Sequence, residues 1–570
     1  MPRYTTVKKP LDKRAAWFAQ QRFGVFAHFG LYSLLQQHEW VMRHQSISRE
    51  NYRKLMKRFN PRHFDADEWI RFVQRAGGRY FVLTAKHHDG FCLFDSALTD
   101  FKITNTPFGR DLVGQIVAAC HRARLPIVLY YSQPDWMHPS YVHRPGCGKD
   151  WPVPRPGDTP DWSAYLHYMF GQVEELCTKY GRIDGIWFDG LNKSDSEWRG
   201  RDLYRLIKRH QPHAVVNDRA GYGDYYTPER RMATAATASG YMVEACDCVA
   251  RGAWCYLPEA ELRSSPSLIA DLVRLSAAGG NYLLNIGPKA DGSLPAAWVQ
   301  RFEDIGDWLA EYGKSIYDTH GCPRPGGEES PEQLYTRRGK TLYLHLLRWP
   351  DTNRLTLGRL TKAPSSARLM GNKHHLTAEM VNGQVLLKGL PALPANTSAS
   401  VIELKFNSPS FLRPAAPLPV APRLEFTGDA PLEVRLFDAP GVFLSFKGLP
   451  LPTYPFRGQA QEDWSNLWQA EHRVAWPLRS TRAGWVEVSM EVSSGADTHG
   501  STFTLRAGDS QMQGVIPTSG KWFRFVTVPL GRLRLPKGRF NLVMTPQNVK
   551  FPGRFGIVRK LILKPTKRSR

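Results

Sequence analysis

Between residues 20 and 315, short apolar runs alternate with longer segments in which apolar residues recur at helical spacing. This alternation is typical of repeated βα units, in which each strand is followed by a helix that covers it. Helices are expected over Asp111–Arg124 and Ser196–Lys208. About seven such units, without a glycine-rich dinucleotide fingerprint, favour a TIM-like (β/α) barrel over an open sheet. The expected strands are Phe23–Phe29, Arg79–Ala85, Pro126–Tyr131, Ile183–Phe188, Ala214–Asn217, Tyr241–Glu244 and Tyr282–Ile286.

The 570 residues exceed what one hydrophobic core usually organises, and the pattern changes after the barrel segment. Short segments of alternating polarity follow it in two groups, each of which predicts the antiparallel strands of a β-sandwich. Prolines are frequent between the two groups and favour an extended linker. We therefore expect an α/β chain with four parts: a (β/α) barrel at 1–320, a supporting β-sandwich at 321–408, a linker at 409–424 and a second β-sandwich with a basic tail at 425–570.

Composition and cysteine spacing exclude several classes of protein. No stretch approaches the ~18 consecutive apolar residues of a membrane span, and the first twenty residues hold no apolar signal segment. We expect a cytoplasmic protein, or a periplasmic or secreted one if a signal has been removed. The eight cysteines do not form a disulfide framework. Cys246, Cys248 and Cys255 cluster without the spacing of a zinc site, so no structural zinc is expected.

The net charge of +24 suits an anionic partner but does not identify it. The basic residues are dispersed, and the one dense basic run is the tail from Lys564 to Arg570. Since the sequence contains no nucleic-acid-binding motif, nucleic acid is not an expected partner. The charge does not indicate an oligomeric state.

Polar or ionisable residues follow six of the expected strands. Because the carboxyl ends of barrel strands meet at one face, we expect these side chains to form a single pocket. A carboxylate directly after an apolar strand costs several kcal/mol to desolvate unless it is paired or chemically used, so Asp189 is the most informative of them. Taken alone, it fits a catalytic acid and a helix cap equally well. The six strand endings are Ala27–Gly30, Lys86–Gly90, Tyr130–Ser132, Phe188–Gly190, Asn217–Arg219 and Val243–Glu244.

Two kinds of hydrolysis fit such a pocket. His28, His87 and His88 could supply a three-histidine zinc site. Glycoside hydrolysis instead needs two carboxylates, donors for sugar hydroxyls and an aromatic wall for the apolar face of the sugar. The aromatic residues that adjoin the expected strand ends favour the glycosidase: Trp40, Trp136, Trp187 and Tyr131.

Eight segments resemble the motif series of glycoside hydrolase family 29, the α-L-fucosidases, and occur in that family's order: Phe23–Gly30, Glu39–Trp40, Leu83–Phe91, Gly109–Val113, Leu129–Ser132, Trp187–Gly190, Asn217–Arg219 and Asn281–Pro288. The resemblance implies a retaining exo-α-L-fucosidase that uses no metal or cofactor and acts on fucosylated oligosaccharides or polysaccharides. In the family's pattern Asp189 matches the nucleophile. The positions that match fucose-contacting residues are His28, Glu39, Trp40, His87, His88, Tyr131, Trp187 and Arg219.

The acid/base residue is less fixed, because its position varies within the family. Glu229 resembles the acid/base of many members, and we favour it over Glu244, which would then be a supporting carboxylate. Phe29 and Val243 stand where the family usually has tryptophan. These two departures predict a reshaped outer wall and an altered linkage preference, with the reaction unchanged.

Other functions remain open at this point. The barrel could belong to a catalytically weak fucose-binding protein, or to a zinc-dependent hydrolase that uses the three histidines. The second β-sandwich resembles carbohydrate-binding modules in strand pattern alone, so sugar binding and structural support are equally compatible with it. Trp464, Trp468 and Trp522 could be sugar-binding platforms or core residues. The positive charge adds the hypothesis that the substrate is an anionic polymer such as a sulfated fucan.

Overall fold

A computed structural model describes residues 6–7, 11, 13–143, 150–151, 155–190, 193–229, 242–322, 333–357, 360–372, 374–411, 424–427, 430–435, 442–446, 449–450, 472–493, 500–517, 526–548 and 557–566. The chain divides into two compact units, Met1–Pro414 and Ala415–Arg570, and each is described by itself. Most of the expected linker at 409–424 lies outside the described residues, as do Trp464, Trp468 and Trp522.

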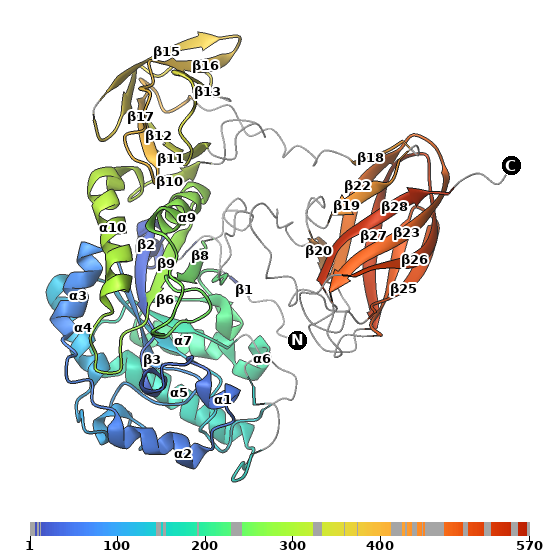
Figure 1. Cartoon of the computed structure of the whole chain (residues 1–570). Helices are drawn as coiled ribbons and strands as arrows, with labels where there is room; N and C mark the ends of the chain where they lie inside the picture. The colour runs from blue at the N-terminus through green and yellow to red at the C-terminus, as the bar shows by residue number, and fades with distance from the viewer. Residues whose placement is uncertain are drawn as a thin grey trace. The chain divides into compact units, whose positions relative to one another are not determined.

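The first unit contains a seven-stranded sheet in which every pairing is parallel (Figure 1). Most of its buried residues are apolar, on both faces, as expected of strands covered by helices outside and packed against one another inside. It forms the curled sheet of a TIM-like barrel. In spatial order the strands are β6 (Val215–Val216), β5 (Gly185–Phe188), β4 (Ile127–Tyr131), β3 (Phe81–Lys86), β2 (Phe23–Ala27), β9 (Asn281–Ile286) and β8 (Glu244–Cys248).

The segment Tyr225–Glu229 lies between the two outer strands of this sheet. Tyr225 forms a parallel bridge with Asn217 beside β6, whereas Tyr226 and Glu229 form parallel bridges with Val243 and Cys246 on the β8 side. Backbone hydrogen bonds of 2.9 to 3.1 Å accompany the β8 contacts. An irregular eighth segment therefore spans the gap between β6 and β8. We call it the closing segment.

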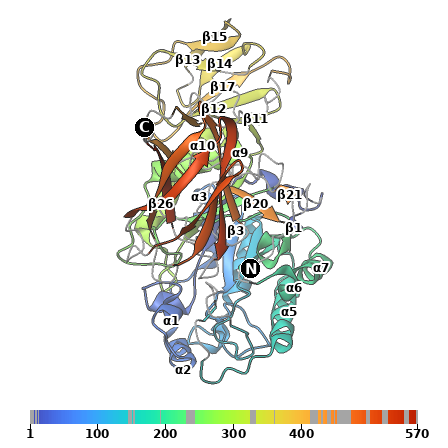
Figure 2. The same ribbon diagram turned by 90° about the vertical axis from the view of Figure 1, so that its right-hand side faces the viewer.

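Helices cover the outside of the barrel (Figures 1 and 2). Three of them begin at an aspartate whose carboxylate accepts the backbone N–H three residues later, which is the preferred cap of a helix N-terminus: Asp65, Asp111 and Asp161. The main helices are α3 (Ala66–Arg75), α4 (Leu112–Ala123), α5 (Trp162–Thr178), α7 (Gly200–His210), α9 (Ser265–Ala278) and α10 (Ala296–Tyr312). Short helices are α1 (Val41–His44), α2 (Arg49–Arg53), α6 (Asp195–Trp198) and the 3₁₀ turns η1 (Ala16–Gln20), η2 (Leu31–Leu34), η3 (Lys54–Arg58), η4 (Ile103–Asn105), η5 (Asp218–Ala220) and η6 (Gly313–Ser315).

The barrel prediction is confirmed, with two local corrections. The helix expected over Ser196–Lys208 is split, because Arg199 adopts a left-handed conformation (φ 52°) between α6 and α7. The strand expected over Tyr241–Glu244 is displaced toward the C-terminus, since β8 begins at Glu244. Its sequence Glu-Ala-Cys-Asp-Cys alternates small and polar residues, which gave it no apolar run.

An antiparallel eight-stranded sheet follows the barrel within the first unit. It packs beside α9 and α10: the Trp308 indole donates to the Ala399 carbonyl (3.0 Å), and Lys314 pairs with Glu403 (2.8 Å). Leucines from nearly all of its strands meet in one apolar core, as the alternating pattern predicted. In spatial order the strands are β10 (His320–Cys322), β11 (Gln333–Arg338), β12 (Thr341–Leu346), β17 (Ser400–Lys405), β14 (Ser366–Leu369), β15 (His375–Val381), β16 (Gln384–Lys388) and β13 (Arg354–Leu357).

The second unit is a β-sandwich, as predicted. Apolar side chains from both of its sheets share one core, which includes Trp476, Met490 and Phe503. One sheet has the order β21 (Leu449–Pro450), β20 (Val442–Phe446), β22 (His472–Ser480), β27 (Gly538–Asn548), β24 (Thr502–Ala507) and β25 (Ser510–Val515), with β18 (Leu424–Phe426) paired to β22. The other has the order β19 (Leu432–Arg435), β28 (Ile557–Pro565), β23 (Gly484–Ser493) and β26 (Val526–Leu535).

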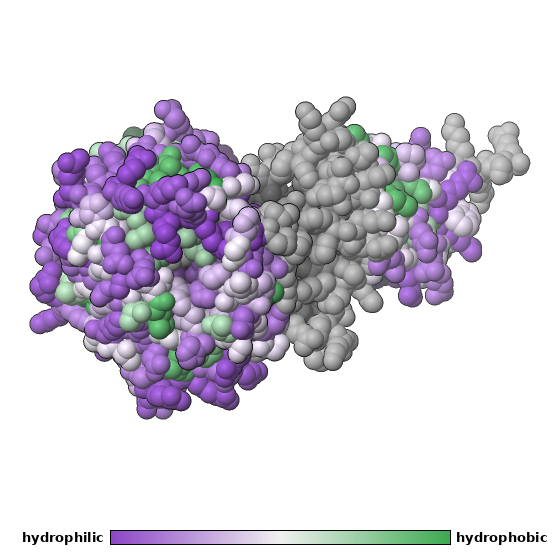
Figure 3. All heavy atoms as spheres, turned by 90° about the horizontal axis from the view of Figure 1, so that it is seen from below, coloured by the Kyte–Doolittle hydropathy of each residue, from purple (hydrophilic) through white to green (hydrophobic). Residues whose placement is uncertain are grey.

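The described surface and helices fit the composition. On the coloured part of the face drawn in Figure 3, hydrophilic side chains cover most of the surface, and apolar ones form small separate patches. Within the described ranges, no helix has the length and apolar character needed to cross a membrane. Seven of the eight cysteines are among the described residues, and all seven are buried.

Candidate active site

The candidate site lies at the carboxyl ends of the barrel strands. Along β5, Trp187 packs into the barrel interior, and Phe188 packs outward against the helix layer. Strand alternation therefore turns Asp189 inward, above Trp187. A side chain on the following Gly190 would collide with Gln133, which explains why glycine follows this aspartate.

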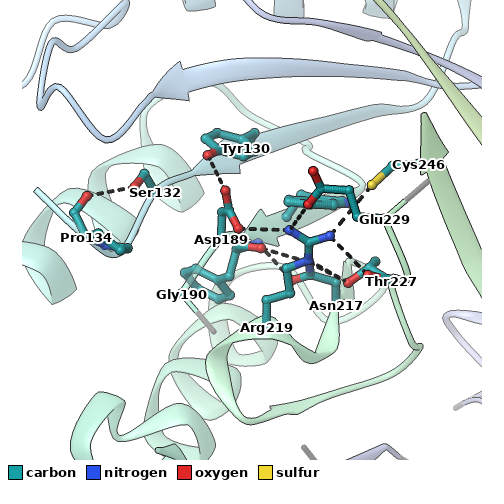
Figure 4. Close-up of polar contacts among 12 residues, drawn as sticks. Tyr130, Ser132, Pro134, Asp189, Gly190, Asn217, Arg219, Thr227, Glu229 and Cys246 are labelled. Carbon is teal, nitrogen blue, oxygen red and sulfur yellow. Dashed lines mark hydrogen bonds and ion pairs between the residues drawn. The ribbon is translucent and has the colours of Figure 1, made fainter. Parts of the chain in front are cut away.

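Asp189 is held by donors from two other strand ends (Figure 4). Its Oδ1 accepts from Arg219 Nη1 (2.9 Å), and its Oδ2 accepts from the Tyr130 hydroxyl (2.8 Å). His88 Nε2 lies 3.4 Å from Oδ2. The side chain of Asp189 keeps 10% of its surface exposed, so the carboxylate is fixed in orientation yet reachable.

Arg219 on η5 links the two candidate catalytic carboxylates. Its Nη1 lies 2.9 Å from Asp189 Oδ1 and 3.4 Å from Glu229 Oε2, and Nη2 donates to the Thr227 carbonyl (3.1 Å). Burial alone would lower the pKa of Arg219, but the charge of Asp189, with smaller help from Cys246 and Glu229, raises it above the usual range. The guanidinium is therefore a permanent cation between the two acids.

Trp187 supports this cation from below. The Arg219 guanidinium lies 4.4 Å from the centre of the indole, and the Tyr130 ring stacks on the same indole at 5.5 Å and 21°. Cation–π contacts of this kind are worth about 2 kcal/mol when desolvated. Since neighbouring side chains already pack on the indole, it positions Arg219 and offers little free face to a sugar.

Glu229 and Glu244 differ sharply in surroundings. The Glu229 side chain, on the closing segment, is 42% exposed and faces Asp189 across Arg219 (Figure 4). Glu244 is fully buried inside the barrel, where Oε2 accepts from the Tyr80 hydroxyl (2.6 Å) and Oε1 from the Trp187 indole (2.8 Å). Burial raises the pKa of Glu244 to about 7, against the opposing effect of these hydrogen bonds.

Three histidines lie close together at the ends of β2 and β3. His28 Nδ1 lies 2.7 Å from Asn285 Oδ1, and the His87 ring is 5.6 Å from that of His28 and 4.3 Å from that of His88. All three are at most 4% exposed. Such closely packed imidazoles can donate to or accept from several sugar hydroxyls.

The tautomer of His88 follows from its partner. Ser132 Oγ donates its only proton to the Pro134 carbonyl (2.7 Å), so it must accept from His88 Nδ1, 2.5 Å away. Nδ1 therefore carries a proton, and Nε2 is the nitrogen that faces Asp189.

Aromatic residues form the outer wall. Trp40 is half-buried and contacts His88 and Trp136 edge-on at 5.4 and 5.6 Å. Trp254 lies 5.0 Å from the His28 ring and is also half-buried. Glu39 Oε2 accepts from the backbone N–H of Trp254 (3.0 Å), so this predicted sugar ligand also fixes the second tryptophan.

The structure corrects the prediction for Tyr131. Its hydroxyl donates to Gln172 on α5 (2.8 Å), outside the barrel, and the residue is fully buried. Tyr130 contacts Asp189 instead. The two tyrosines are adjacent on β4, so they point to opposite faces of the sheet. Tyr130 pairs in register with Trp187, whose side chain faces the barrel interior, and this pairing identifies Tyr130 as the tyrosine that faces the site.

The expected reshaping of the wall by Phe29 and Val243 is also corrected. Phe29 is 1% exposed and packs against Phe59 and Trp69 in the layer between sheet and helices. Val243 is fully buried against Tyr226. Neither side chain borders the pocket, so neither departure alters its wall.

The histidines do not assemble into a metal site. His28 Nδ1 and His88 Nδ1 are already engaged by Asn285 and Ser132, and His88 Nε2 faces Asp189. Among the described residues, no group of three or more His, Cys, Asp or Glu side chains has an arrangement that could hold a metal ion.

Comparison with known proteins agrees with this geometry. The family model described as Alpha-L-fucosidase matches residues 1–314. Tissue alpha-L-fucosidase from Bos taurus is 29% identical over 427 residues, which cover 69% of this chain and 88% of the relative. The solved alpha-L-fucosidase isoenzyme 1 from Paenibacillus thiaminolyticus is 31% identical with a TM-score of 0.64, and the match covers 70% of this chain and 99% of that one.

A second solved structure bears on the chemistry. It is a trapped covalent intermediate of a GH29 alpha-L-fucosidase from Bacteroides thetaiotaomicron with 2-fluoro-fucosyl fluoride, 26% identical with a TM-score of 0.62, covering 70% of this chain and 98% of that one. The family model spans more than half of the chain, and it matches the barrel that carries the candidate site. The chain belongs to the alpha-L-fucosidase family of glycoside hydrolases, family 29.

Proposed function

We propose that the protein is a retaining exo-α-L-fucosidase that removes terminal α-L-fucose from fucosylated glycans, with Asp189 as nucleophile and Glu229 as acid/base. The observation that carries the proposal is the placement of both carboxylates on one nitrogen of Arg219. Two carboxyl groups on either side of one sugar position are what glycoside hydrolysis requires.

In the first step, a carboxylate oxygen of Asp189 attacks the anomeric carbon, and the bond to the leaving oxygen breaks. Glu229, protonated at this stage, donates its proton to the leaving oxygen, so the aglycone departs as a neutral alcohol. The product is a fucosyl ester of Asp189. The Tyr130 and Arg219 hydrogen bonds hold the carboxylate in position for this attack.

In the second step, Glu229 acts as a base and removes a proton from water, which attacks the anomeric carbon from the side that the aglycone left. The ester bond breaks and Asp189 regains its charge. Two displacements restore the original configuration, so the product is α-L-fucose. The 42% exposure of Glu229 suits this role, because the residue must meet both aglycone and water.

The spacing of the two carboxylates supports retention. Asp189 Oδ1 and Glu229 Oε2 lie 2.9 and 3.4 Å from the same nitrogen. The two carboxylate oxygens cannot be farther apart than these two distances added together. That sum is below ~6.5 Å, the shortest carboxyl separation of inverting enzymes. Among related proteins, the fucosidase trapped as a covalent intermediate supports the same pathway.

Recognition of the sugar is assigned to the walls of the pocket. We propose that His28, His87 and His88 bind the ring hydroxyls, while Trp40 and Trp254 pack on apolar parts of the sugar. An indole is a suitable surface for the C5 methyl group of a 6-deoxy sugar.

The direct test follows the anomer released from an aryl α-L-fucoside by NMR. We expect α-L-fucose to appear first and the β-anomer to grow only through mutarotation. Initial release of the β-anomer would contradict the double displacement, and fucose binding without any turnover would contradict the enzymatic function itself.

The two adjacent tyrosines provide a matched test of the site. Tyr130→Phe removes the hydroxyl that donates to Asp189, and we expect kcat for an aryl fucoside to fall by roughly 10- to 100-fold, because one charge-assisted hydrogen bond is worth about 1.5–3 kcal/mol. Tyr131→Phe makes the same chemical change one residue away, where the hydroxyl donates to Gln172. It should leave kcat within about twofold and lower only the free energy of unfolding, by about 1 kcal/mol. Equal losses of kcat in both variants would contradict the assignment.

Glu244 should make stability depend on pH. Its folded pKa of about 7 lies above its ordinary value, so the folded state keeps a proton that the unfolded state releases. The associated stability is complete below about pH 4.5 and is lost as pH rises through about 7, a change on the order of 3 kcal/mol.

Glu244→Gln carries no such proton. From about pH 4.5 to pH 8, the free energy of unfolding of the wild type should therefore fall relative to that of the variant. Denaturant unfolding of both proteins at several pH values measures this difference. A difference that does not change with pH would show that the pKa of Glu244 is the same in the folded and unfolded states, and would contradict the raised value.

A further inference from the structure

The second unit exposes one large aromatic side chain on an otherwise ordered sheet. Trp485 on β23 is 53% exposed, and it is the one aromatic residue among the strongly exposed large hydrophobic side chains of the described residues. Its neighbours Val486 and Val488 are buried in the sandwich core. The Thr566 hydroxyl donates to the Trp485 carbonyl (2.9 Å), so the indole stands on a fixed backbone.

Basic side chains surround this indole on the outer face of the sheet. Arg534 on β26 lies in register with Trp485, and two residues along the strand Glu487 lies between Arg532 and Lys564. All five side chains are exposed. Figure 1 shows β28, β23 and β26 as adjacent strands of this sheet. We call these five residues the Trp485 face.

The face carries three cations and one carboxylate. Glu487 and Arg532 are only loosely paired, at 3.9 Å. Among the residues that the structure describes, no carboxylate pairs with Arg534 or Lys564. The whole unit shares this bias: residues 415–570 contain 22 Lys and Arg against 11 Asp and Glu.

We propose that the Trp485 face binds a sulfated, fucose-containing polysaccharide. A flat exposed indole can stack on the apolar face of a sugar ring, and arginine and lysine beside it can bind sulfate oxygens. The two contributions meet on one rigid sheet, so a single extended chain can use both. The choice of a fucose-containing polymer rests on the function proposed for the barrel; the stacking and charge arguments do not.

The experiment measures binding of the full-length protein to a sulfated fucan, to the same fucan after desulfation and to duplex DNA. We expect at least about 10-fold tighter binding to the sulfated fucan than to the desulfated one at about 50 mM salt, and a much smaller difference at about 500 mM, because salt screens exposed charges.

Variants separate stacking from general charge. Trp485→Ala should weaken binding to the sulfated fucan by roughly 10-fold, and Trp485→Tyr should restore most of it. We expect stacking of a sugar ring to lie at the lower end of the about 1–3 kcal/mol per base that aromatic stacking contributes in single-stranded nucleic-acid complexes. Replacing Arg534 and Lys564 together by glutamine should weaken binding by a similar factor at low salt. The matched control replaces Arg506 and Arg539, exposed on the other sheet, and should change binding by less than about twofold.

Three outcomes would overturn the proposal. One is an equal loss in the control pair, which would mean diffuse attraction to any polyanion. Another is DNA binding of the same strength and the same dependence on Trp485. The third is a lower melting temperature of Trp485→Ala with unchanged glycan binding, which would place the indole in a contact within the protein. Release of fucose from an aryl fucoside is measured in parallel, and its absence from every sample with intact glycan binding would contradict only the function proposed for the barrel.

Discussion

Replacing Asp189 by alanine should lower kcat/KM for an aryl α-L-fucoside by about 10⁴-fold or more, since removing a nucleophile from a catalytic unit eliminates most of its rate enhancement. The substrate pocket should persist, because the histidine and tryptophan rings also pack against one another. Fucose should still bind to the variant. Steady-state kinetics together with a binding measurement test both statements.

Azide identifies the step that is lost. In Asp189→Ala, azide can occupy the space of the missing carboxylate and displace the aglycone in one step, so the product should be β-L-fucosyl azide. Asp202→Asn on α7 is the control, since Asp202 pairs with the surface residues Arg199 and Arg205. It should retain wild-type kinetics. Activity of Asp189→Ala within about tenfold of wild type would exclude this residue as the nucleophile.

Replacing Glu229 by alanine should affect substrates unequally. For a fucoside with a poor leaving group, the rate should fall by about 10² to 10⁴-fold, because the leaving oxygen is no longer protonated. For a fucosyl fluoride or a nitrophenyl fucoside, the first step needs little acid assistance, and the ester of Asp189 should accumulate as a burst of product. Kinetics across a series of leaving groups measures the difference.

Azide should also rescue Glu229→Ala, but with the opposite stereochemistry. Here azide attacks the fucosyl ester, so the product is α-L-fucosyl azide. Glu244→Gln is the matched control: it should show no burst and no azide rescue, because Glu244 is buried beneath Trp187. A strong dependence on leaving group in the Glu244 variant, with none in the Glu229 variant, would reverse the assignment.

The barrel could be predicted from sequence because its strands are apolar on both faces and end in polar residues. The run Ile183–Phe188 contains β5, and Pro126–Tyr131 contains β4. Such runs predict a strand well, because few structures other than a strand of a covered parallel sheet bury a short apolar run on both sides. The polar residues after the strands also predicted the site, because chain direction alone brings strand ends together.

The direction in which a strand side chain points could not be predicted from the sequence, because it depends on how neighbouring strands are paired. Tyr130 and Tyr131 have the same chemistry, and a resemblance between motifs does not distinguish which of two adjacent tyrosines points inward. Pairing of Tyr130 with Trp187 decides it. Phe29 is a second case, since it is adjacent to the inward-facing His28 and therefore faces the helix layer.

The closing segment could not be predicted from the sequence, for a different reason. Tyr225–Glu229 contains a proline and makes only isolated bridges, so it has no strand pattern, and the sequence predicts a loop. The left-handed Arg199 between α6 and α7 is similar: nothing in its residue type marks the break. Both are set by tertiary packing, which local sequence does not encode.

One nitrogen of Arg219 contacts both Asp189 and Glu229, so Arg219 can stabilise whichever of the two carboxylates is ionised at each stage of the reaction. In the proposed mechanism, Asp189 is ionised and Glu229 carries a proton at the start, and once Asp189 is esterified, Glu229 is the ionised one. A single fixed cation lies within 3.4 Å of both, so in each half of the cycle it faces one negative charge. In the proposed cycle the negative charge passes from Asp189 to Glu229 while Arg219 stays in place, so the buried guanidinium keeps an anionic partner in both half-reactions.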